Sequence, residues 1–522
     1  MKYFTLSFII SMLLMFASCQ NNNQNDYPES VKETLEKADD NAENLDAVLQ
    51  HYLENPQDSL KYRAACFLIG NMGEKHAWVD FELQAENENP IVFNVLDYKN
   101  YDGLLDAWDS LENVHGELSF KTSEYVYDYD TLTTEFLIQN INLAFVAWQE
   151  KPWAKHLTFD EFCAYILPHR STNEPIGNWR EFFMNEYAWV LDSVSDPENP
   201  VEAAVLINND IRSWFHFDSR FYEHPADQSY DEMLEGKRGR CEDMTNLAIF
   251  AMRANGVAVT SDYTPYWANT GNNHAWNAIL DKSGNVSIFM GAEANPGDYE
   301  LSNRWAKVYR KTYAAQKPSL VVASGKPVDS LPAYINRSYY ADVTAEYGDV
   351  SDVHLNFDAS DENIVYLCVF NSGEWKAIHW AKIHEGEAVF TDMAREIAYL
   401  PAYYQNNEIV PAGDPFILDV DENMLPLKAE NKFITLTIGE TTYRTTFATT
   451  DNVRLDELKA GVNYEMFVWN DAWVLLDEQV YHGEDLQFDN LPKNSLYWLK
   501  VKNGREEERI FTVDETGKLL FW

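Results

Sequence analysis

The hydrophobic pattern of the chain changes its period along the sequence, and this limits the architectures that the chain can adopt. From Tyr27 to about residue 155, apolar residues recur mostly at the three- and four-residue spacing of amphipathic helices. Residues 158–313 mix helical and alternating segments, and after Pro318 short β-branched or aromatic segments follow one another between Gly, Asn and Asp turns. Because neither an all-helical nor an all-β architecture accommodates these patterns, we expect a multidomain α+β protein.

The length of the chain supports the same division. At about 150 residues per domain, the 522 residues form three to four folding units. We expect a signal peptide at 1–18, a flexible tether at 19–26, a helical N-terminal domain at 27–155, a mixed α+β domain at 156–317, and two antiparallel β-sandwich modules at 318–428 and 429–522. The expected strands of the modules include 338–344, 364–370, 375–382, 433–438, 443–449, 464–469, 497–502 and 508–513.

The composition excludes several classes of protein. Hydrophobic residues make up 46% of the chain and aromatic residues 14%, which excludes disordered and collagen-like chains. The 84 Asp and Glu residues against 40 Lys and Arg give a net charge of −44, which repels phosphate backbones, so we expect no nucleic-acid partner. The five cysteines are too few for a disulfide framework, and no C-x-x-C pair is present. We predict no cofactor and no metal site.

The N-terminus has the zones of a secretory signal. Lys2 precedes an apolar run at 8–16, and Ala17 and Ser18 stand directly before Cys19. Small residues before a cysteine resemble the lipobox of bacterial lipoproteins, in which that cysteine is lipidated and becomes the first mature residue. The resemblance implies a protein of the bacterial cell envelope that is attached to the membrane by lipidated Cys19 only. The alternative is an ordinary cleaved signal, beside which Cys19 is incidental.

Cys241 stands at the start of a predicted helix. Residues 236–240 contain two glycines and are typical of a loop, residues 241–254 carry an apolar stripe at helical spacing, and Asn255-Gly256 ends the helix. A thiol in the first turn of a helix is close to unpaired N–H groups and their partial positive charge, which lower its pKa. Cys241 is therefore predicted to be an activated nucleophile. The alternative is a buried structural cysteine.

His274 lies in a predicted hairpin. Residues 272–280 form a strand-like run, residues 282–285 a turn, and residues 286–291 a returning strand. A turn centred between Ser283 and Gly284 places Glu293 directly opposite His274. Side chains that oppose one another across two strands are close enough for a carboxylate to reach one imidazole nitrogen.

Cys241, His274 and Glu293 together offer a nucleophile, a base and an orienting acid, the set that nucleophilic acyl chemistry requires. A four-residue loop starting at Asp281 would instead place Gly291 opposite His274, and the acid would be lost. The next candidates for the orienting group, further along the return segment, are Asn295 and Asp298.

Acyl chemistry also needs hydrogen-bond donors for the carbonyl oxygen, on which negative charge develops. The backbone N–H of Cys241 is the first donor that the sequence offers. Gln228 and Trp214 precede the helix at distances that suit a second donor, although both residue types more often have structural roles.

Three runs around these residues resemble the transglutaminase-like superfamily: GRCED at 239–243, ANGV at 254–257 and HAWN at 274–277. That superfamily includes transglutaminases and peptide N-glycanases, and it has a papain-like arrangement of Cys, His and usually Asp. The resemblance covers about residues 200–300. It implies a transglutaminase-like α+β catalytic domain in which Cys241 is the nucleophile and His274 the base, with Glu293 where the superfamily usually has Asp.

The resemblance implies a cysteine enzyme that acts on an amide bond through a thioester acyl-enzyme. Hydrolysis is preferred over crosslinking, because water is the default acceptor unless the site excludes it. The substrate classes that fit are a peptide, a glycopeptide or a cell-wall peptide. The chain as a whole resembles multidomain lipoproteins of Bacteroidetes-type bacteria. The alternative is a non-catalytic surface binding or assembly protein that retains the transglutaminase-like fold.

Replacing Cys19 with alanine should release the protein into the soluble fraction. The acyl attachment site is lost in this variant, and no later apolar run of the sequence is long enough to span a bilayer. The measurement is immunoblotting of membrane and soluble fractions, with Gln20→Ala as a control that stays in the membrane. Retention of Cys19→Ala in membranes would contradict the lipoprotein prediction.

Overall fold

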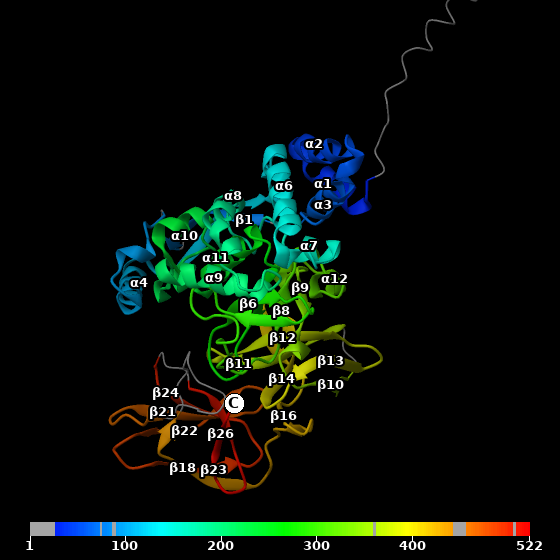
Figure 1. Cartoon of the computed structure of the whole chain (residues 1–522). Coiled ribbons are helices and arrows are strands. Elements are labelled where there is room, and N and C mark those ends of the chain that lie inside the picture. Colours follow the sequence, from blue (N-terminus) through cyan, green and yellow to red (C-terminus); the bar gives the residue numbers. More distant parts are fainter. Residues whose placement is uncertain (1–26, 74–75, 86–89, 359–361, 442–455, 505–507) are drawn as a thin grey trace, which may run out of the picture. The chain divides into compact units, whose positions relative to one another are not determined.

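A computed structural model describes residues 27–73, 76–85, 90–358, 362–441, 456–504 and 508–522 (Figure 1). The predictions for the leader, for Cys19 and for a strand at 443–449 lie outside these residues. By its internal contacts the chain divides into two compact units, Met1–Lys75 with Tyr127–Leu137 and His76–Val126 with Ile138–Trp522. In the part of the chain that is described, no helix combines the length and the apolar character needed to cross a bilayer.

The first unit is helical, as the spacing of its apolar residues predicts. Each main helix buries one apolar face, represented by the fully buried Val31, Leu49 and Leu68. Helix α6 (Thr134–Glu150) begins in this unit and continues into the second. The other helices of the unit are α1 (Glu29–Lys37), α2 (Ala42–Leu53), α3 (Ser59–Gly70) and α5 (Asp128–Thr131).

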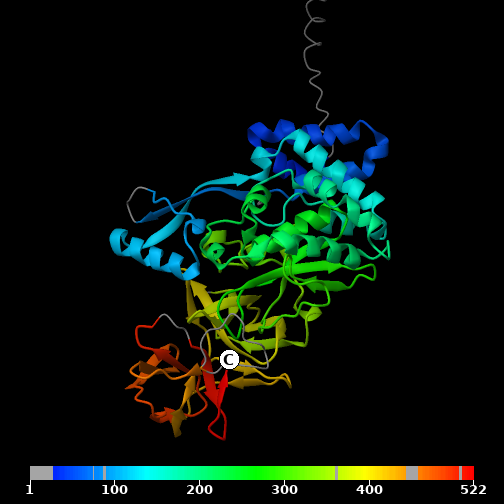
Figure 2. The same ribbon diagram turned by 60° about the vertical axis from the view of Figure 1, so that its left-hand side comes forward.

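The segment that follows contains a strand pair that the sequence analysis does not predict. Strand β1 (His76–Ala85) pairs with β2 (Leu118–Tyr127), and helix α4 (Tyr101–His115) lies between them in the sequence (Figure 2). The run FELQA within β1 alternates in polarity, which is the signal that was available. One small apolar cluster unites the helix with the strands and includes Leu83, Trp108, Leu111, Leu118 and Phe120.

The mixed α+β region is built around helix α11 (Cys241–Ala254). Its residues from Asp243 onward are buried, because α8 and α9 flank the helix and β5 and β6 pack against it (Figure 1). The sheet is antiparallel in the order β7-β6-β5-β8-β9. The further elements are α7 (Phe159–Tyr165), α8 (Trp179–Glu186), α9 (Pro200–Trp214), α10 (Tyr230–Gly236), α12 (Leu320–Ser324), β3 (His216–Phe217), β4 (Arg238–Gly239), β5 (Val259–Thr264), β6 (His274–Leu280), β7 (Val286–Phe289), β8 (Tyr309–Lys311) and β9 (Tyr340–Asp342).

Two antiparallel β-modules follow, as the short strand signals predict. In the first, the pair β10–β13 faces the sheet of β11, β12, β14, β15, β16 and β17 across a core that includes Val353, Leu367 and Phe390. Its strands are β10 (Val350–Asn356), β11 (Ile364–Asn371), β12 (Glu374–Lys382), β13 (Glu387–Ala394), β14 (Ile397–Gln405), β15 (Glu408–Pro411), β16 (Phe416–Leu418) and β17 (Met424–Pro426).

The second module repeats this plan. The pair β18–β23 and the sheet β22-β21-β24-β25-β26 share a core that includes Leu436, Met466 and Phe488. Its strands are β18 (Phe433–Ile438), β19 (Glu440–Thr441), β20 (Asp456–Glu457), β21 (Asn463–Trp469), β22 (Trp473–Val480), β23 (Leu486–Pro492), β24 (Tyr497–Val501), β25 (Ile510–Val513) and β26 (Leu519–Phe521). The predicted multidomain α+β class is thus confirmed.

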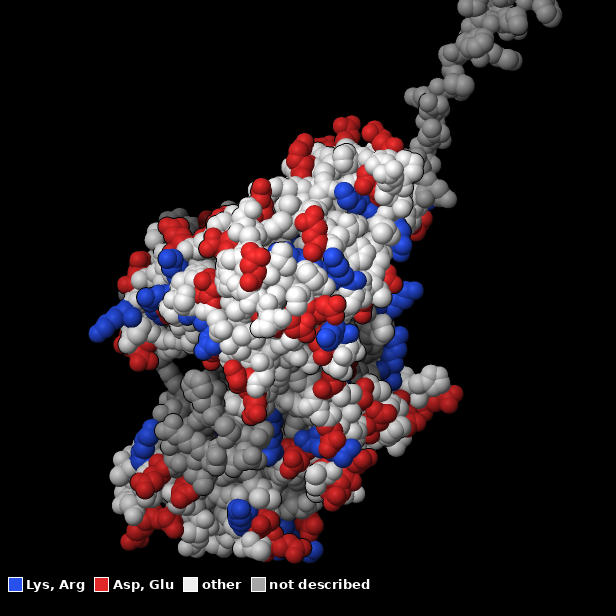
Figure 3. Space-filling model, viewed as in Figure 1, with Lys and Arg blue, Asp and Glu red and all other residues white. Residues whose placement is uncertain are grey.

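The surface carries the acidic excess of the sequence. On the face drawn in Figure 3, Asp and Glu side chains are spread over the described elements instead of gathering in one patch. Lys and Arg side chains lie among them and form no continuous basic surface on this face.

A buried side chain joins helix α11 to the β6–β7 hairpin. Asn277 of β6, which is fully buried, donates from Nδ2 to the carbonyl oxygen of Thr245 (3.0 Å) and accepts from the N–H of Gly291 (3.0 Å). A Cβ added to Gly291 would stand 2.3 Å from the carbonyl oxygen of Met244 and 2.7 Å from the Cβ of Ala248. Because no side chain fits there, glycine permits the close approach of hairpin and helix.

Gly291→Ala should therefore lower the free energy of unfolding by about 1–3 kcal/mol, the usual cost of overpacking a filled interior. Urea denaturation followed by tryptophan fluorescence measures the effect. Gly236→Ala is the matched control, because a Cβ at Gly236 meets nothing within 4 Å. If Gly291→Ala is as stable as the control, the close approach of hairpin and helix is wrong.

Candidate active site

Cys241 is the first residue of α11, and Asp243 holds the turn that leads to it. The backbone of Arg240 is extended (φ −83°, ψ −179°), so the helix begins only at the next residue. The buried carboxylate of Asp243 accepts hydrogen bonds from the backbone N–H groups of Arg240 (2.9 Å) and Gln228 (3.0 Å). A carboxylate that bonds back to the N-cap backbone from the first turn fixes where a helix starts. Cys241 is thereby held at the N-terminus of α11.

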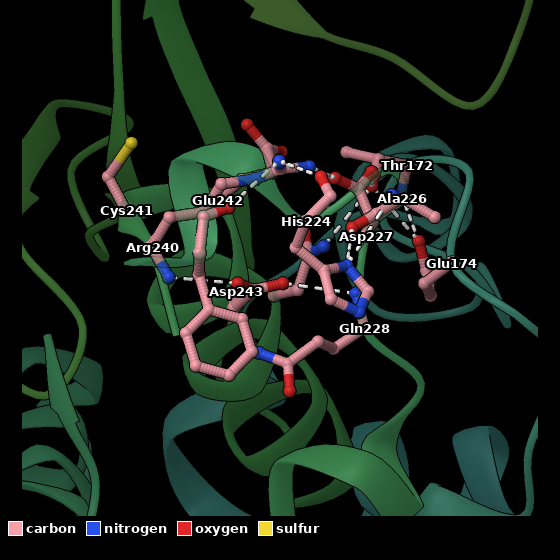
Figure 4. A network of polar contacts seen from close by, with 12 residues as sticks. Thr172, Glu174, His224, Ala226, Asp227, Gln228, Arg240, Cys241, Glu242 and Asp243 are labelled. Carbon is pink, nitrogen blue, oxygen red and sulfur yellow. Dashed lines mark hydrogen bonds and ion pairs between the residues drawn. The ribbon is translucent and has the colours of Figure 1, made fainter. Parts of the chain in front are cut away.

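The side chain of Arg240 anchors the same turn in a polar network (Figure 4). Its guanidinium donates to Oδ1 of Asp227 (2.9 Å) and to the carbonyl oxygen of His224 (3.0 Å), while Thr172 donates to the other oxygen of Asp227 (2.6 Å). Burial raises the pKa of Asp227, but the charge of Arg240 and the hydrogen bonds outweigh burial, and the pKa falls to about 2. The sulfur of Cys241 points away from this network (Figure 4).

The thiol of Cys241 is half-buried, and its pKa is raised instead of lowered. Burial is the largest cause and the charge of Glu242 adds to it, while the N–H of Ala275 and the charge of Arg240 act in the opposite direction; the pKa is about 11. The predicted lowering by the helix N-terminus is therefore wrong, because burial outweighs it. Ala275 directly follows His274, so the hydrogen bond from its N–H places the thiol beside the start of β6.

Glu242 is paired with a cation from the sheet. Its carboxylate forms an ion pair with Lys311 of β8, and the Lys311 ammonium also lies over the ring of Tyr263, 5.7 Å from its centroid. The pair brings a negative and a positive charge to the residue next to the thiol. The negative charge acts on the thiol, since Glu242 is among the causes that raise the pKa of Cys241.

His274 is the first residue of β6 and pairs with Thr264 of β5. Its ring contacts the rings of Trp267 (centroids 5.8 Å apart) and Trp276 (5.9 Å), and its Nε2 lies 2.7 Å from Oη of Tyr299. Burial lowers the pKa of His274 to about 4. The imidazole is therefore neutral at pH 7, and aromatic rings and one hydroxyl group fix its orientation.

The register of the β6–β7 hairpin differs from the predicted one. Asn277 pairs with Phe289, and the same register continued to His274 points at Ala292. The prediction that Glu293 stands directly opposite His274 is therefore wrong. The alternative, a four-residue loop that would place Gly291 opposite His274, is not formed either.

The side chain of Asp281 sets this register. Its Oδ1 accepts hydrogen bonds from the N–H groups of Ser283 (2.7 Å) and Asn285 (2.9 Å), and the N–H of Asp281 donates to the carbonyl oxygen of Asn285 (2.9 Å). An aspartate that bonds to the backbone two residues further on stabilises a turn of its own. The turn therefore encloses three residues, where the prediction had two.

The carboxylate of Glu293 points to solvent. The chain turns sharply after β7, with Ala292 at a φ of +58°. Buried Asn208 of α9 holds this turn, because it accepts from the N–H of Ala292 (2.8 Å) and donates to the carbonyl oxygen of Ala294 (3.2 Å). Glu293 is exposed, and among the described residues it forms no hydrogen bond with His274.

Asn295 and Asp298, the next candidates for the orienting group, do not take this role either. Asn295 accepts a hydrogen bond from Asn208 (3.0 Å) and belongs to the same turn. Asp298 is exposed and, in the part of the chain that the structure describes, does not bond to His274. The group that bonds to the imidazole is Tyr299, the residue after Asp298.

The side chains of Gln228 and Trp214, the candidate second donors for a carbonyl oxygen, donate to other groups. Gln228 donates from Nε2 to the carbonyl oxygen of Arg238 (2.9 Å), and the indole N–H of Trp214 donates to Asp210 (3.2 Å). Both side chains thus have structural roles. The backbone N–H of Cys241, at the N-terminus of α11, is the donor that the sequence analysis and the structure share.

The support behind His274 has no signal in the sequence. Trp276 donates from its indole nitrogen to Oη of Tyr347 (2.8 Å), and this hydroxyl donates to Asp262 (2.6 Å), which receives two hydrogen bonds from Arg310 (2.9 and 2.8 Å). These partners are distant in sequence, so no local pattern connects them. The network fixes Trp276 and, through the ring contact, His274.

Tyr334, from the segment between β8 and β9, also reaches this site. Its backbone adopts a φ of +66°, a strained value for a bulky residue. Its hydroxyl accepts a hydrogen bond from Nδ2 of Asn273, and its carbonyl oxygen accepts one from Oη of Tyr263 (3.0 Å). Burial raises the pKa of Tyr334, while the charges of Arg337 and Arg240 act in the opposite direction.

The arrangement provides a thiol at a helix N-terminus next to the backbone at the start of β6, a neutral imidazole on the first residue of that strand, and a hydroxyl group on the Nε2 of that imidazole. Among the described residues, no group of three or more His, Cys, Asp or Glu side chains is placed to bind a metal ion. A thiol and an imidazole in this order can carry out nucleophilic chemistry in which the imidazole carries the proton.

Residues 187–288 match the sequence model of the transglutaminase-like superfamily. This range includes Cys241 and His274 and spans the elements from α9 to β7. The chain therefore contains a transglutaminase-like domain, as its motifs predict. No curated protein matches the chain.

Two solved structures show a distant likeness. A protein from Cytophaga hutchinsonii, described as a candidate cysteine protease, is 18% identical over 22% of this chain and 39% of its own, with a TM-score of 0.19. Red sea bream transglutaminase is 9% identical over 65% of this chain and 73% of its own, with a TM-score of 0.17. The chain thus spans about two fifths of the first of these proteins. Because both TM-scores are too low to indicate a common fold, the match to the superfamily model alone identifies the domain.

Glu242→Gln should speed the alkylation of Cys241 by iodoacetamide at pH 8. The substitution removes a charge that raises the thiol pKa and leaves the Lys311 ammonium beside it, so the pKa falls and the thiolate fraction rises. With a pKa of about 11, about one thiol in a thousand is ionised at pH 8, and each fall of the pKa by one raises that fraction about tenfold. We expect labelling about tenfold faster.

Mass spectrometry of the peptide that contains Cys241 measures the rate. Glu235→Gln, which removes an exposed charge from α10, is the matched control and should label at the wild-type rate. In the wild type, labelling should rise steadily from pH 7 to pH 10 without a plateau. A plateau below pH 8 would show that the thiol pKa is lowered after all.

Proposed function

We propose that the protein is a cysteine enzyme that cleaves an amide bond through a thioester acyl-enzyme, with Cys241 as nucleophile and His274 as base. One observation carries this proposal: the thiol at the N-terminus of α11 lies beside the first residues of β6, where His274 stands. The match of this region to the transglutaminase-like superfamily supports the same chemistry.

In the first half-reaction, the thiol proton moves to Nδ1 of His274 while the sulfur attacks the carbonyl carbon of the substrate. The C–S bond forms, the C–N bond breaks, and His274 gives the proton to the leaving amine. The pKa of the thiol is about 11 and that of the imidazole about 4, so the free protein holds a neutral pair and the proton moves as the attack proceeds. The backbone N–H of Cys241 donates to the oxygen on which negative charge develops.

Water resolves the thioester in the second half-reaction. His274 accepts a proton from the water, the oxygen attacks the carbonyl carbon, and the C–S bond breaks. The sulfur recovers its proton from His274, and a carboxylic acid leaves the site. Hydrolysis is preferred over transfer to a second amine, because water is the default acceptor at a site that it can enter.

The place of the reaction is proposed from the sequence. Lipidated Cys19 attaches the protein to the bacterial cell envelope, and the substrate is a peptide, a glycopeptide or a cell-wall peptide. The spread of acidic side chains over the surface in Figure 3 supports a partner other than nucleic acid.

Cys241→Ala should abolish the release of p-nitrophenolate from p-nitrophenyl acetate, an activated ester that reports on reactive thiols without knowledge of the natural substrate. In the wild type we expect a burst of one product per protein, followed by slower turnover, because acylation precedes hydrolysis of the thioester. Mass spectrometry should find the acetyl group on Cys241. The variant should retain less than about one hundredth of the burst rate, with an unchanged melting temperature.

Addition of cadaverine separates hydrolysis from transfer. A hydrolase releases acetate at an unchanged rate, whereas an enzyme that prefers amine acceptors turns over faster and forms acetyl cadaverine. If Cys241→Ala and the wild type release p-nitrophenolate at the same rate, the enzyme proposal is wrong. The non-catalytic binding protein then becomes the better proposal, and the raised pKa of the thiol is the observation that favours it.

A further inference from the structure

One ring nitrogen of His274, Nε2, has a hydrogen-bond partner within the site. Nε2 lies 2.7 Å from Oη of Tyr299, a residue of the loop after β7. The thiol lies on the side of β6 where the N–H of Ala275 reaches the sulfur of Cys241. With Nε2 occupied, Nδ1 is the nitrogen that remains for the thiol.

We propose that Tyr299 is the positioning residue of this site, and that its hydroxyl oxygen holds His274 in the tautomer with the proton on Nε2, the role that a carboxylate usually has. The inference rests on the proposed function, because it concerns the base of that reaction. In this tautomer Nδ1 carries the lone pair that receives the thiol proton, whereas the other tautomer has no lone pair there. Wrong tautomers of a catalytic histidine cost orders of magnitude in rate.

The environment of Tyr299 favours an accepting hydroxyl oxygen. Burial first, and then the negative charge of Glu293, raise the pKa of Tyr299, so the hydroxyl keeps its proton. A negative charge attracts the positive end of an O–H dipole. In the proposed tautomer the hydroxyl hydrogen points away from Nε2, and the negative charge of Glu293, which acts on the Tyr299 hydroxyl group, favours this orientation.

A hydroxyl group and a carboxylate act differently on the charge of the imidazole. A carboxylate on Nε2 would stabilise the imidazolium and raise its pKa. Tyr299 is neutral, and the pKa of His274 stays at about 4 because burial is not offset. The base is lost only when His274 takes up a proton, so kcat/KM for p-nitrophenyl acetate should stay constant from pH 7 down to about pH 5 and then fall.

The test is a double-mutant cycle on the full chain, with p-nitrophenyl acetate as probe. Tyr299→Phe should lower kcat by about 10–100-fold, the effect of losing the hydrogen-bond partner that orients a metal-binding histidine, and leave KM within about twofold. In a His274→Gln background the same substitution should change the rate by less than about twofold, because Tyr299 acts through His274. A merely structural role would lower the rate in both backgrounds.

Two variants complete the comparison. Tyr187→Phe is the matched control, since it also removes one hydrogen bond of a buried tyrosine in this region, to Asp210 (3.0 Å), and it should keep the wild-type kcat. Glu293→Gln should lower kcat less than Tyr299→Phe does, because the charge of Glu293 only orients the Tyr299 hydroxyl group.

Three results would overturn the inference. The first is that Tyr299→Phe retains kcat within about threefold of the wild type while Cys241→Ala is inactive. The second is that Tyr299→Phe lowers the rate as much in the His274→Gln background as in the wild type. The third is that Glu293→Gln lowers kcat more than Tyr299→Phe does. The last result would return the orienting role to the carboxylate. If instead Cys241→Ala is as active as the wild type, the proposed function itself fails.

Discussion

The relative position of the thiol and the imidazole depends on one buried side chain, that of Asn277. Its amide joins the carbonyl oxygen of Thr245, one turn into α11, to the N–H of Gly291 at the end of the hairpin. Thr245 lies one turn after Cys241, and Asn277 lies on the same strand as His274, so this bridge couples the start of the helix to the start of the strand. Breaking it would leave buried polar groups unpaired, at a cost of about 1–3 kcal/mol for each group. Both reactive groups therefore stand on rigid elements.

Burial dominates the electrostatics of the site. A helix N-terminus typically stabilises a negative charge by about 0.3–1 kcal/mol and by at most about 2 kcal/mol, whereas a thiol pKa raised from 9.0 to about 11 disfavours the thiolate by about 3 kcal/mol. The imidazole follows the same rule, because its pKa falls when its ring is enclosed by Trp267 and Trp276. The free site is thus a neutral pair, and the thiolate forms only during attack. A protonated thiol resists adventitious oxidation and alkylation.

The sequence predicts those parts of the site whose signals are local. The glycine loop, the apolar stripe and the Asn-Gly end indicate α11, which begins at Cys241 as predicted. The strand-like run around His274 indicates β6, which begins two residues later than the predicted run, at His274. The register of the hairpin was beyond reach, because loops of two, three or four residues fit the same alternation. The hydrogen bonds of the Asp281 side chain decide among them. The prediction of Glu293 as the direct partner of His274 failed for this reason.

Tyr299 was beyond reach for a different reason. It lies in a segment without periodicity, and the turn before it is held by Asn208 of α9, which is distant in sequence. The pKa of Cys241 was mispredicted because the helix terminus is visible in the sequence and the extent of burial is not. A strand at 338–344 was expected in the first β-module, because its composition resembles that of the module strands that follow it. The three-residue strand β9 instead pairs with β8 and so belongs to the sheet that packs against α11.

Long-range 1H–15N correlation NMR of protein labelled with 15N at histidine observes the neutral pair directly. Comparison with His274→Gln assigns the two ring nitrogens of His274. We expect a neutral ring at pH 7 with the proton on Nε2, and a titration midpoint near pH 4. An imidazolium at pH 7, or a neutral ring with the proton on Nδ1, would contradict the neutral pair and the role of Tyr299 alike.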